Sequence, residues 1–313
     1  MRCWSVVVAL CLCGNVVLAG TERGVRSVGG TELYDVDPAG ALETALVRDA
    51  TDNTLDQHDL ISAVLIAGGC DEPLRLERLQ IELQDWLSTL PSVDPNETLR
   101  EQSERILRRM HRDLLTGSYR AECSDLAQLI EHGNFNCVGA TVVYLAACET
   151  CGLTAKIQEI PGHVRCQVWL GDRWEIVEPT CREWFTLAND PSQLELIALP
   201  AELKSVWRDP SAGRELAQLG LVAMVYYNRG LDRLEQRDWA GAVAANQLAL
   251  RLDPASRSAR ANLLAIWNNW ALQRSAAGEH AAAEAMLERG LAIAPEFNTF
   301  RLNLGIVRER RGQ

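Results

Sequence analysis

Three residues of the types used in cysteine acyl transfer follow one another at short intervals in this sequence. Cys137 begins the apolar run C-V-G-A-T-V-V-Y-L-A-A, His163 stands in G-H-V, and Glu178 stands in V-E-P-T. A thiol at the start of a helix, followed by a histidine and a carboxylate on two adjacent strands, is the order that such a site requires. The sequence therefore predicts a Cys-His-Glu triad.

The chemistry of the three groups gives each an expected role. The thiolate of Cys137 is the nucleophile, and a helix N-terminus and a nearby imidazolium both favour the anion. His163 serves as base and later as acid, while Glu178 fixes the tautomer and orientation of its ring. The backbone N–H of Cys137 is a natural donor to an oxyanion.

Asn134, Asn136 and Trp174 are candidates to support the triad or an oxyanion. The two asparagines directly precede the expected helix, where a capping role is favoured over an oxyanion role. Simpler alternatives exist for the triad itself. Cys137 can be a small core residue, a single histidine is usually only hydrogen-bonded, and Glu178 can pair with a cation across a hairpin.

Alternating residues predict the strands that must carry the histidine and the acid. T-A-K-I-Q-E-I at 154–160, V-R-C-Q-V-W-L at 164–170 and R-W-E-I-V-E at 173–178 have a period of two. Gly171 and Asp172 form a plausible turn between the last two. The apolar run from Cys137 to Gly152 predicts a helix that is buried on most sides.

A two-residue turn at Gly171 and Asp172 fixes the register of that hairpin. Trp169 then faces Trp174, and Arg165 faces Glu178. His163 and Glu178 become diagonal neighbours on one face, roughly 7 Å apart at the backbone. A carboxylate at that distance can reach an imidazole, whereas a loop of odd length would separate the two.

The N-terminus has the pattern of a cleaved secretory signal in residues 1–19. Its apolar stretch is interrupted and is shorter than the roughly 20 residues of a membrane span, so an uncleaved anchor is the less favoured alternative. We expect a secreted or periplasmic protein with a flexible segment at 20–40. Without Arg2, 30 of the 31 basic residues remain against 42 acidic ones, a net charge near −12. This charge argues against nucleic acid or anionic lipid as partners.

An odd number of cysteines remains after removal of the signal, so in an oxidising compartment at least one is unpaired or bonds another chain. They are Cys70, Cys123, Cys137, Cys148, Cys151, Cys166 and Cys181. Cys137 is the candidate for the free thiol. Cys148 and Cys151 lie inside the expected helix, where a disulfide or simple packing is favoured over zinc. No phosphate-binding loop or dinucleotide fingerprint is present, and we expect neither a cofactor nor a metal.

The pattern changes near residue 200. Segment 41–130 is a series of expected helices, and 131–200 holds the candidate site. Small residues and prolines then recur as in tetratricopeptide repeats over 215–313. Pro254 and Pro295 end two such units and lie 41 residues apart, so the second unit has an insertion or a longer first helix. Such repeats generally bind a peptide or protein partner, although simple packing on the core is an equal alternative.

The residues around the candidate triad resemble the core of the transglutaminase-like superfamily. N-C-V-G-A-T-V-V-Y-L-A-A-C-E-T-C-G-L followed by G-H-V-R-C-Q-V-W-L-G-D-R-W-E-I-V-E-P-T carries the resemblance. The helical segment before it and the repeats after it are similar to the SirB-type branch. In that family Cys opens a buried helix, His begins a strand, and Asp comes near the end of the next, so Glu178 replaces the usual Asp. SirB-type members often lack the thiol, which this chain keeps.

The expected fold class is α+β: a helical lead-in, a papain/transglutaminase-like core with a small antiparallel sheet, and an all-α repeat array. Two functions compete on this basis. The first is a cysteine hydrolase or acyltransferase acting on peptide or protein amides through Cys137, His163 and Glu178. The second is a non-catalytic transglutaminase-like scaffold whose repeats bind a protein partner.

Overall fold

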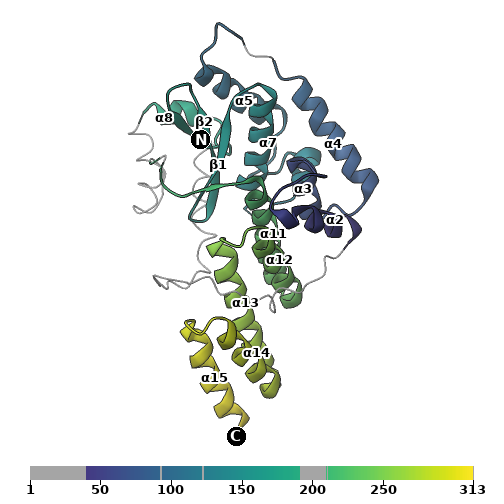
Figure 1. The fold of residues 1–313 in the computed structure, drawn as a ribbon, viewed down its shortest axis with the longest axis vertical. Helices are drawn as coiled ribbons and strands as arrows, with labels where there is room; N and C mark the ends of the chain where they lie inside the picture. The colour runs from purple at the N-terminus through teal and green to yellow at the C-terminus, as the bar shows by residue number, and fades with distance from the viewer. Residues whose placement is uncertain (1–39, 92–93, 122, 191–208, 210, 313) are drawn as a thin grey trace. The chain divides into compact units, whose positions relative to one another are not determined.

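The computed structural model describes residues 40–91, 94–121, 123–190, 209 and 211–312. The expected signal peptide, nearly all of the segment 20–40 and the last ten residues of the expected core lie outside this part of the chain. The described residues fall into two compact units, and the division between them lies at Val225 and Tyr226. Figure 1 shows the course of the chain.

The first unit begins with a series of helices, as the apolar spacing predicts. They are α2 (Ala41–Asp49), a short 3-10 turn η2 (Ala50–Asp52), α3 (Leu60–Ala67), α4 (Pro73–Ser88), α5 (Leu99–Asp113) and α6 (Leu126–His132). Helix α4 buries an apolar stripe made of Leu76, Leu79, Leu83 and Leu87. On α5, Thr98 and Glu101 form a reciprocal capping box that fixes the start of the helix.

Helix α7 (Cys137–Thr150) is the central helix of this unit. Its residues are buried on most sides, which confirms the interpretation of the apolar run. The helix packs against β1 and β2 and against α5. The hydroxyls of Ser103 on α5 and Tyr144 on α7 share a buried hydrogen bond of 2.6 Å. Gly152 follows the helix end with a φ of 71°, a conformation that glycine adopts without strain.

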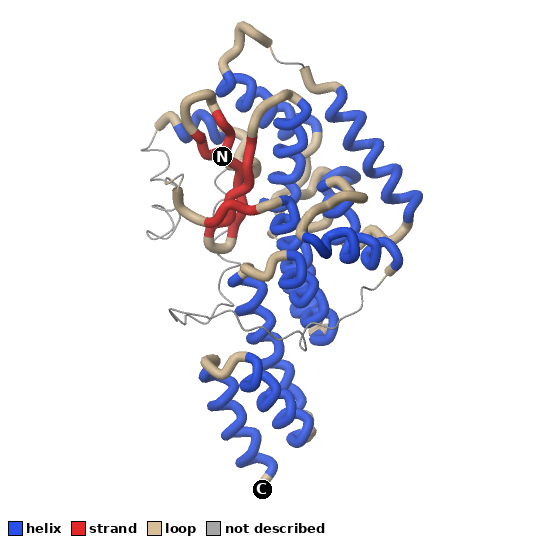
Figure 2. The backbone as a smooth tube through the Cα atoms, in the orientation of Figure 1, coloured by secondary structure: helices blue, strands red, loops and turns tan. Residues whose placement is uncertain are grey.

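The strands form one antiparallel sheet in the order β3-β2-β1-β4. They are β1 (Ala155–Ile160), β2 (His163–Trp169), β3 (Trp174–Val177) and β4 (Arg214–Leu216). The predicted hairpin register is confirmed, because Trp169 pairs with Trp174 and the Leu170 N–H donates to the Arg173 carbonyl at 2.9 Å. Figure 2 shows the strands grouped beside the helices.

Strand β4 is an addition that the sequence did not predict, and it lies beyond the expected core segment 131–200. It has three residues, too few for a period of two to stand out. It pairs with β1 from Ile157 to Glu159. A short helix, α8 (Trp184–Ala188), follows β3. The mixed α+β class is thus confirmed as a mostly helical chain with a small antiparallel sheet.

The second unit is all-helical over its described residues. Its helices are α11 (Gln218–Glu235), within which the division between the units falls, then α12 (Trp239–Leu252), α13 (Arg257–Ala276), α14 (His280–Ile293) and α15 (Asn298–Arg311). From α12 onward, each helix packs on the next. Helix α13 has 20 residues whereas α12 and α14 have 14 each, so a longer helix accounts for the wide spacing between Pro254 and Pro295.

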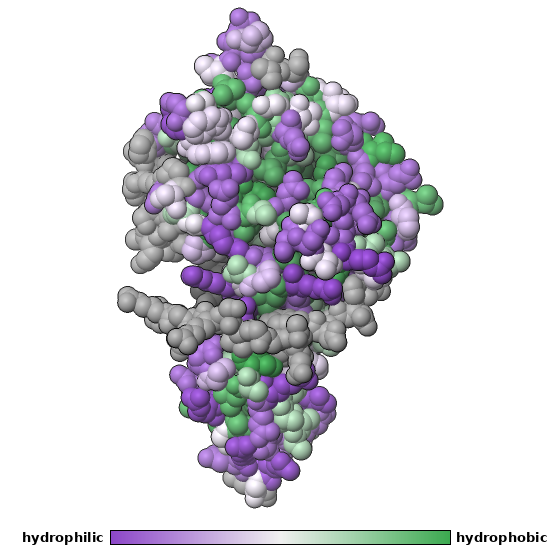
Figure 3. Space-filling view, viewed as in Figure 1, coloured by the Kyte–Doolittle hydropathy of each residue, from purple (hydrophilic) through white to green (hydrophobic). Residues whose placement is uncertain are grey.

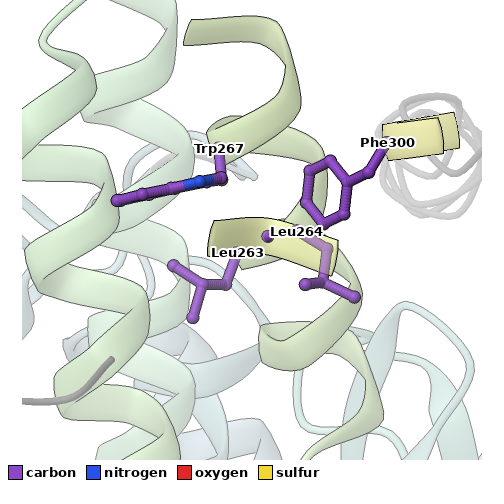
Figure 4. Close-up of a pocket in the computed structure, with 5 residues that line it drawn as sticks. Leu263, Leu264, Trp267 and Phe300 are labelled. Carbon is purple, nitrogen blue, oxygen red and sulfur yellow. The ribbon is translucent and has the colours of Figure 1, made fainter. Parts of the chain in front are cut away.

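Small and aromatic side chains fill the core of the second unit. Its buried cluster comprises Ala271, Ala283, Leu287, Ala294, Phe300, Leu304 and Val307. In Figure 4, Phe300 of α15 points toward Leu264 and Trp267 of α13, beside a small apolar notch. A Cβ added to Gly290 would lie 2.7 Å from the Phe300 ring, so only glycine allows this approach. The predicted small-residue positions therefore serve helix packing.

The face drawn in Figure 3 carries both hydrophilic and hydrophobic residues. Large apolar side chains that are exposed in the described residues are Leu74, Ile81, Leu302 and Ile306. No described helix combines the length and apolarity needed to cross a membrane.

Candidate active site

Asn136 fixes the position of Cys137. It is the N-cap of α7, where its Oδ1 accepts from the Gly139 N–H at 3.0 Å. Its Nδ2 donates to the Ala121 carbonyl at 3.2 Å and to the Ser124 hydroxyl at 3.1 Å. Cys137 is therefore the first residue of the helix, and its side chain lies where the helix dipole favours an anion. This thiol is free and 8% exposed.

His163 and Glu178 come together as the register predicted. The imidazole Nε2 and the carboxylate Oε2 are 2.6 Å apart. The imidazole is buried with 3% of its surface exposed, and Glu178 is fully buried. His163 begins β2, and Glu178 comes one residue after β3, so the antiparallel pairing of these strands brings the two side chains together.

Thr180 holds the other oxygen of the acid. Its backbone N–H and its hydroxyl both donate to Glu178 Oε1, at 3.1 and 2.6 Å. Glu178 thus has one oxygen on His163 and the other on the turn that follows it. This second contact was missed by the sequence reasoning, although a hydroxyl two residues after an acid is a local signal for such a turn.

The charges of the site stabilise an imidazolium. Burial lowers the pKa of His163, but the charges of Glu178 and Cys137 and its hydrogen bonds to both outweigh burial and raise this pKa from 6.5 to about 10. Burial raises the pKa of Glu178, yet the charge of His163 and hydrogen bonds from His163 and Thr180 outweigh it and leave the pKa below its usual value. His163 therefore carries its second proton at neutral pH.

Cys137 is close enough to the same imidazole for its charge to raise the pKa of the ring. Since Nε2 faces Glu178, Nδ1 is the ring nitrogen that can exchange a proton with the thiol. The three predicted residues therefore meet in the order Cys137, His163, Glu178. This arrangement can supply a nucleophile, a proton carrier and an orienting acid.

The support candidates lie in different places. Asn136 is a cap whose amide hydrogens donate to neighbouring loops, so it orients Cys137 indirectly. Asn134 accepts from the Ser118 N–H through Oδ1 at 3.2 Å and thus ties the loop before the helix. The backbone N–H of Cys137 remains the donor beside the thiol.

Trp174 is not brought to the triad. It pairs with Trp169, six residues from His163 along β2, which corresponds to roughly 20 Å of strand. Its ring lies 5.5 Å from that of Trp169 and 4.4 Å from the Lys156 ammonium. Trp174 shares a sheet face with His163, but it lies too far along the strand to take part in the chemistry of the triad.

Arg165 is fully buried beside the site. Its Nε donates to Gln158 Oε1 at 2.7 Å, and its Nη2 donates to the Asp209 carbonyl at 3.1 Å. Burial lowers the pKa of this guanidinium to about 10, against the opposing charges of Glu178 and Asp209. The two carboxylate oxygens of Glu178 are bonded to His163 and Thr180. The hydrogen bonds of Glu178 therefore hold the His163–Glu178 pair.

The remaining buried thiols lie in a different environment. Among them, burial raises the pKa of Cys70, Cys148, Cys151 and Cys166 above the usual value. Their environment thus favours the protonated, unreactive form. Within the described residues, no group of three or more His, Cys, Asp or Glu side chains could hold a metal ion.

No family model matches this chain, and neither the curated proteins nor the solved structures compared with it give a match.

Proposed function

We propose that this protein is a cysteine acyl-transfer enzyme acting on peptide or protein amides, built on a transglutaminase-like core. The observation that carries the proposal is the His163 imidazole, whose Nε2 lies 2.6 Å from Glu178 and whose pKa is raised by the charges of Glu178 and Cys137. Helix α7, led by the thiol, packs on strands that carry the histidine and the acid. This order of elements is what the resemblance to the transglutaminase-like core implies.

The proposed reaction begins with an imidazolium and a thiolate. The Cys137 sulfur attacks the amide carbonyl carbon, and the carbonyl electron pair moves to the oxygen, which the Cys137 N–H stabilises. The C–N bond then breaks as the amine leaves with the proton of His163 Nδ1, and a thioester remains on Cys137. In the second half, water or an amine attacks the thioester carbon and gives its proton to His163. The C–S bond then breaks, which releases the acid or the new amide and restores the Cys137 thiolate beside the His163 imidazolium.

Glu178 serves throughout by holding His163. Its Oε2 accepts from Nε2, which leaves Nδ1 directed to the thiol side. Thr180 fixes Oε1, so the carboxylate is held at both oxygens. Glu178 lies one residue beyond the end of β3, where a longer side chain has to fold back to reach the His163 ring. Glutamate can therefore take the place of the aspartate that is usual in the transglutaminase-like family.

The second unit is proposed to be a short tetratricopeptide-repeat array that binds a peptide or protein partner. Its support is the stacked series α12 to α15, in which Ala271, Ala283 and Gly290 sit at the small-residue positions. With its N-terminal signal pattern, the protein is proposed to be secreted or periplasmic. The competing proposal, a non-catalytic scaffold with the same partner-binding repeats, is favoured by the low exposure of Cys137, since a thiol 8% exposed leaves little room for a substrate.

Alkylation with iodoacetamide from pH 4 to pH 9, with the labelled residue located by mass spectrometry, separates these proposals. We expect labelling of Cys137 below pH 7, loss of that labelling in Cys137→Ala, and a strong decrease in His163→Ala. Cys166 is a matched internal control because burial raises its pKa and should suppress its labelling in that range. A Cys137 that remains unlabelled below pH 7, or is labelled equally without His163, would falsify the catalytic proposal.

A p-nitrophenyl ester provides a direct test of the acyl step. We expect a burst of p-nitrophenolate and an acyl group on Cys137 that mass spectrometry detects. Addition of a primary amine then distinguishes the two outcomes of the second step. Faster release of the acyl group as an amide indicates transfer, and release as the free acid alone indicates hydrolysis.

A further inference from the structure

His111 at the end of α5 touches both halves of the candidate site. Its Nε2 lies 2.9 Å from the carbonyl oxygen of Pro179, the residue that joins Glu178 to Thr180. Its ring meets that of Phe135 edge to face at 5.9 Å, and Phe135 stands two residues before Cys137. One side chain thus contacts the segment that carries the acid and the segment that carries the nucleophile.

The chemistry of these contacts defines the state of the ring. A carbonyl oxygen only accepts, so His111 donates its Nε2–H to Pro179. Burial lowers the pKa of His111 to about 4, with the Arg182 charge acting in the same direction and the Pro179 bond and Glu178 charge opposing it. The ring is therefore neutral at pH 7, and it adds no second charge that would compete with His163 for Glu178.

The two segments are themselves anchored. Phe135 is buried, its N–H donates to the Ser118 carbonyl at 3.2 Å, and its carbonyl accepts from the Arg120 N–H at 2.9 Å. On the other side, Thr180 fixes Glu178. The His111 ring contacts both Phe135 and Pro179, which lies 68 positions after His111 in the sequence. It thus links the segment of Phe135 to the segment of Glu178 and Thr180.

We propose that His111 is a positioning residue of this site. It holds the Glu178–Thr180 turn in the position from which the Glu178 carboxylate contacts His163. The inference rests on the proposed function for its catalytic consequence but not for its geometry. Without the Nε2–H donor, the Pro179 carbonyl loses its hydrogen bond from His111 and the turn relaxes. Glu178 then holds the imidazole of His163 less firmly, and Cys137 loses part of its imidazolium partner.

Two substitutions separate the donor from the ring. His111→Phe keeps an aromatic ring against Phe135 but has no donor, whereas His111→Gln has an amide donor that can reach Pro179. At pH 6 we expect roughly a threefold to tenfold slower alkylation of Cys137 in His111→Phe, the range of one hydrogen bond, and recovery to near the wild-type rate in His111→Gln. His280→Gln, in the second unit, is the matched histidine control and should leave the rate unchanged.

An NMR titration of the His163 ring tests the geometry even if Cys137 is not reactive. The groups that act on His163 are Glu178 and Cys137, so its titration reports directly on the acid. We expect the His163 midpoint to fall in His111→Phe and to return in His111→Gln, with near-UV circular dichroism confirming that both variants fold. An unchanged His163 titration in a folded His111→Phe overturns the positioning role. An unreactive wild-type Cys137 with a shifted titration instead overturns only the catalytic proposal.

Discussion

Replacing Glu178 by glutamine removes the charge beneath His163 while keeping the shape of the side chain. In the wild-type site both partners are buried, and a carboxylate oxygen lies 2.6 Å from Nε2. Breaking a buried ion pair by neutralising one partner typically costs about 3–5 kcal/mol. A rise in the His163 pKa from 6.5 to about 10 corresponds to on the order of 5 kcal/mol, at the upper end of that range.

The dependence on pH identifies the cause. The pKa of His163 is raised in the folded state, so the stability that it contributes is fully present below pH 6.5 and is lost as the pH rises through about 10. In Glu178→Gln, the charge of Glu178 no longer opposes the effect of burial and only Cys137 still does, so the His163 pKa falls. We therefore expect the difference in unfolding free energy between wild type and variant to be largest near pH 6 to 7 and to shrink toward pH 10.

Urea unfolding at intervals of one pH unit from 6 to 10 measures this difference. Wild type and variant share the other groups that titrate at high pH, among them the buried thiols. The contributions of these groups to the unfolding free energy therefore cancel in the difference between the two proteins. Glu178→Asp is the matched control, since it keeps the charge but is one methylene too short for the observed contact, and we expect a loss of about 1–2 kcal/mol. A Glu178→Gln loss below about 1 kcal/mol, or one that does not change with pH, refutes the buried ion pair.

Two further predictions concern packing around the site and in the second unit. Asn136→Ala should lower the unfolding free energy by about 2 kcal/mol, because it removes a cap and the donor to the Ala121 carbonyl and the buried Ser124 hydroxyl. Ser256→Ala, which removes only the cap of α13, should cost about 1 kcal/mol. Equal losses in urea unfolding would contradict the extra role of Asn136. Gly290→Ala should destabilise the second unit by about 1–3 kcal/mol because its Cβ meets Phe300, while Gly305→Ala, with open space around it, should stabilise α15 by about 0.5–1 kcal/mol. Thermal melts that rank these two glycine variants the other way would show that the close approach at Gly290 is not required.

The order and spacing of the local signals were enough to predict most of the elements around the site. Alternation placed β1, β2 and β3, and a turn of Gly171 and Asp172 was sufficient to fix the pairing of Trp169 with Trp174. This works because a hairpin couples register to loop length, and side chains on one face follow from it. The contact of His163 with Glu178 is a consequence of that register. The buried α4 stripe follows equally from helical periodicity.

Other features depend on contacts between residues far apart in the chain. The bond from His111 to Pro179 spans 68 positions, and nothing near His111 in the sequence indicates it. Strand β4 is three residues long and exists because β1 offers it an edge to pair with. Trp174 shares a face with His163, yet only the length of β2 shows that it lies too far away to assist.

The sequence by itself determined which residue types stand at the start of α7, at the start of β2 and after β3, because periodicity and turn chemistry are local properties. The tertiary structure decided how these residues are charged and held. Burial of His163 between Glu178 and Cys137 raises its pKa to about 10, and Thr180 and His111 fix the turn that carries the acid. Those effects depend on distance and solvent exclusion, which only the packed protein supplies.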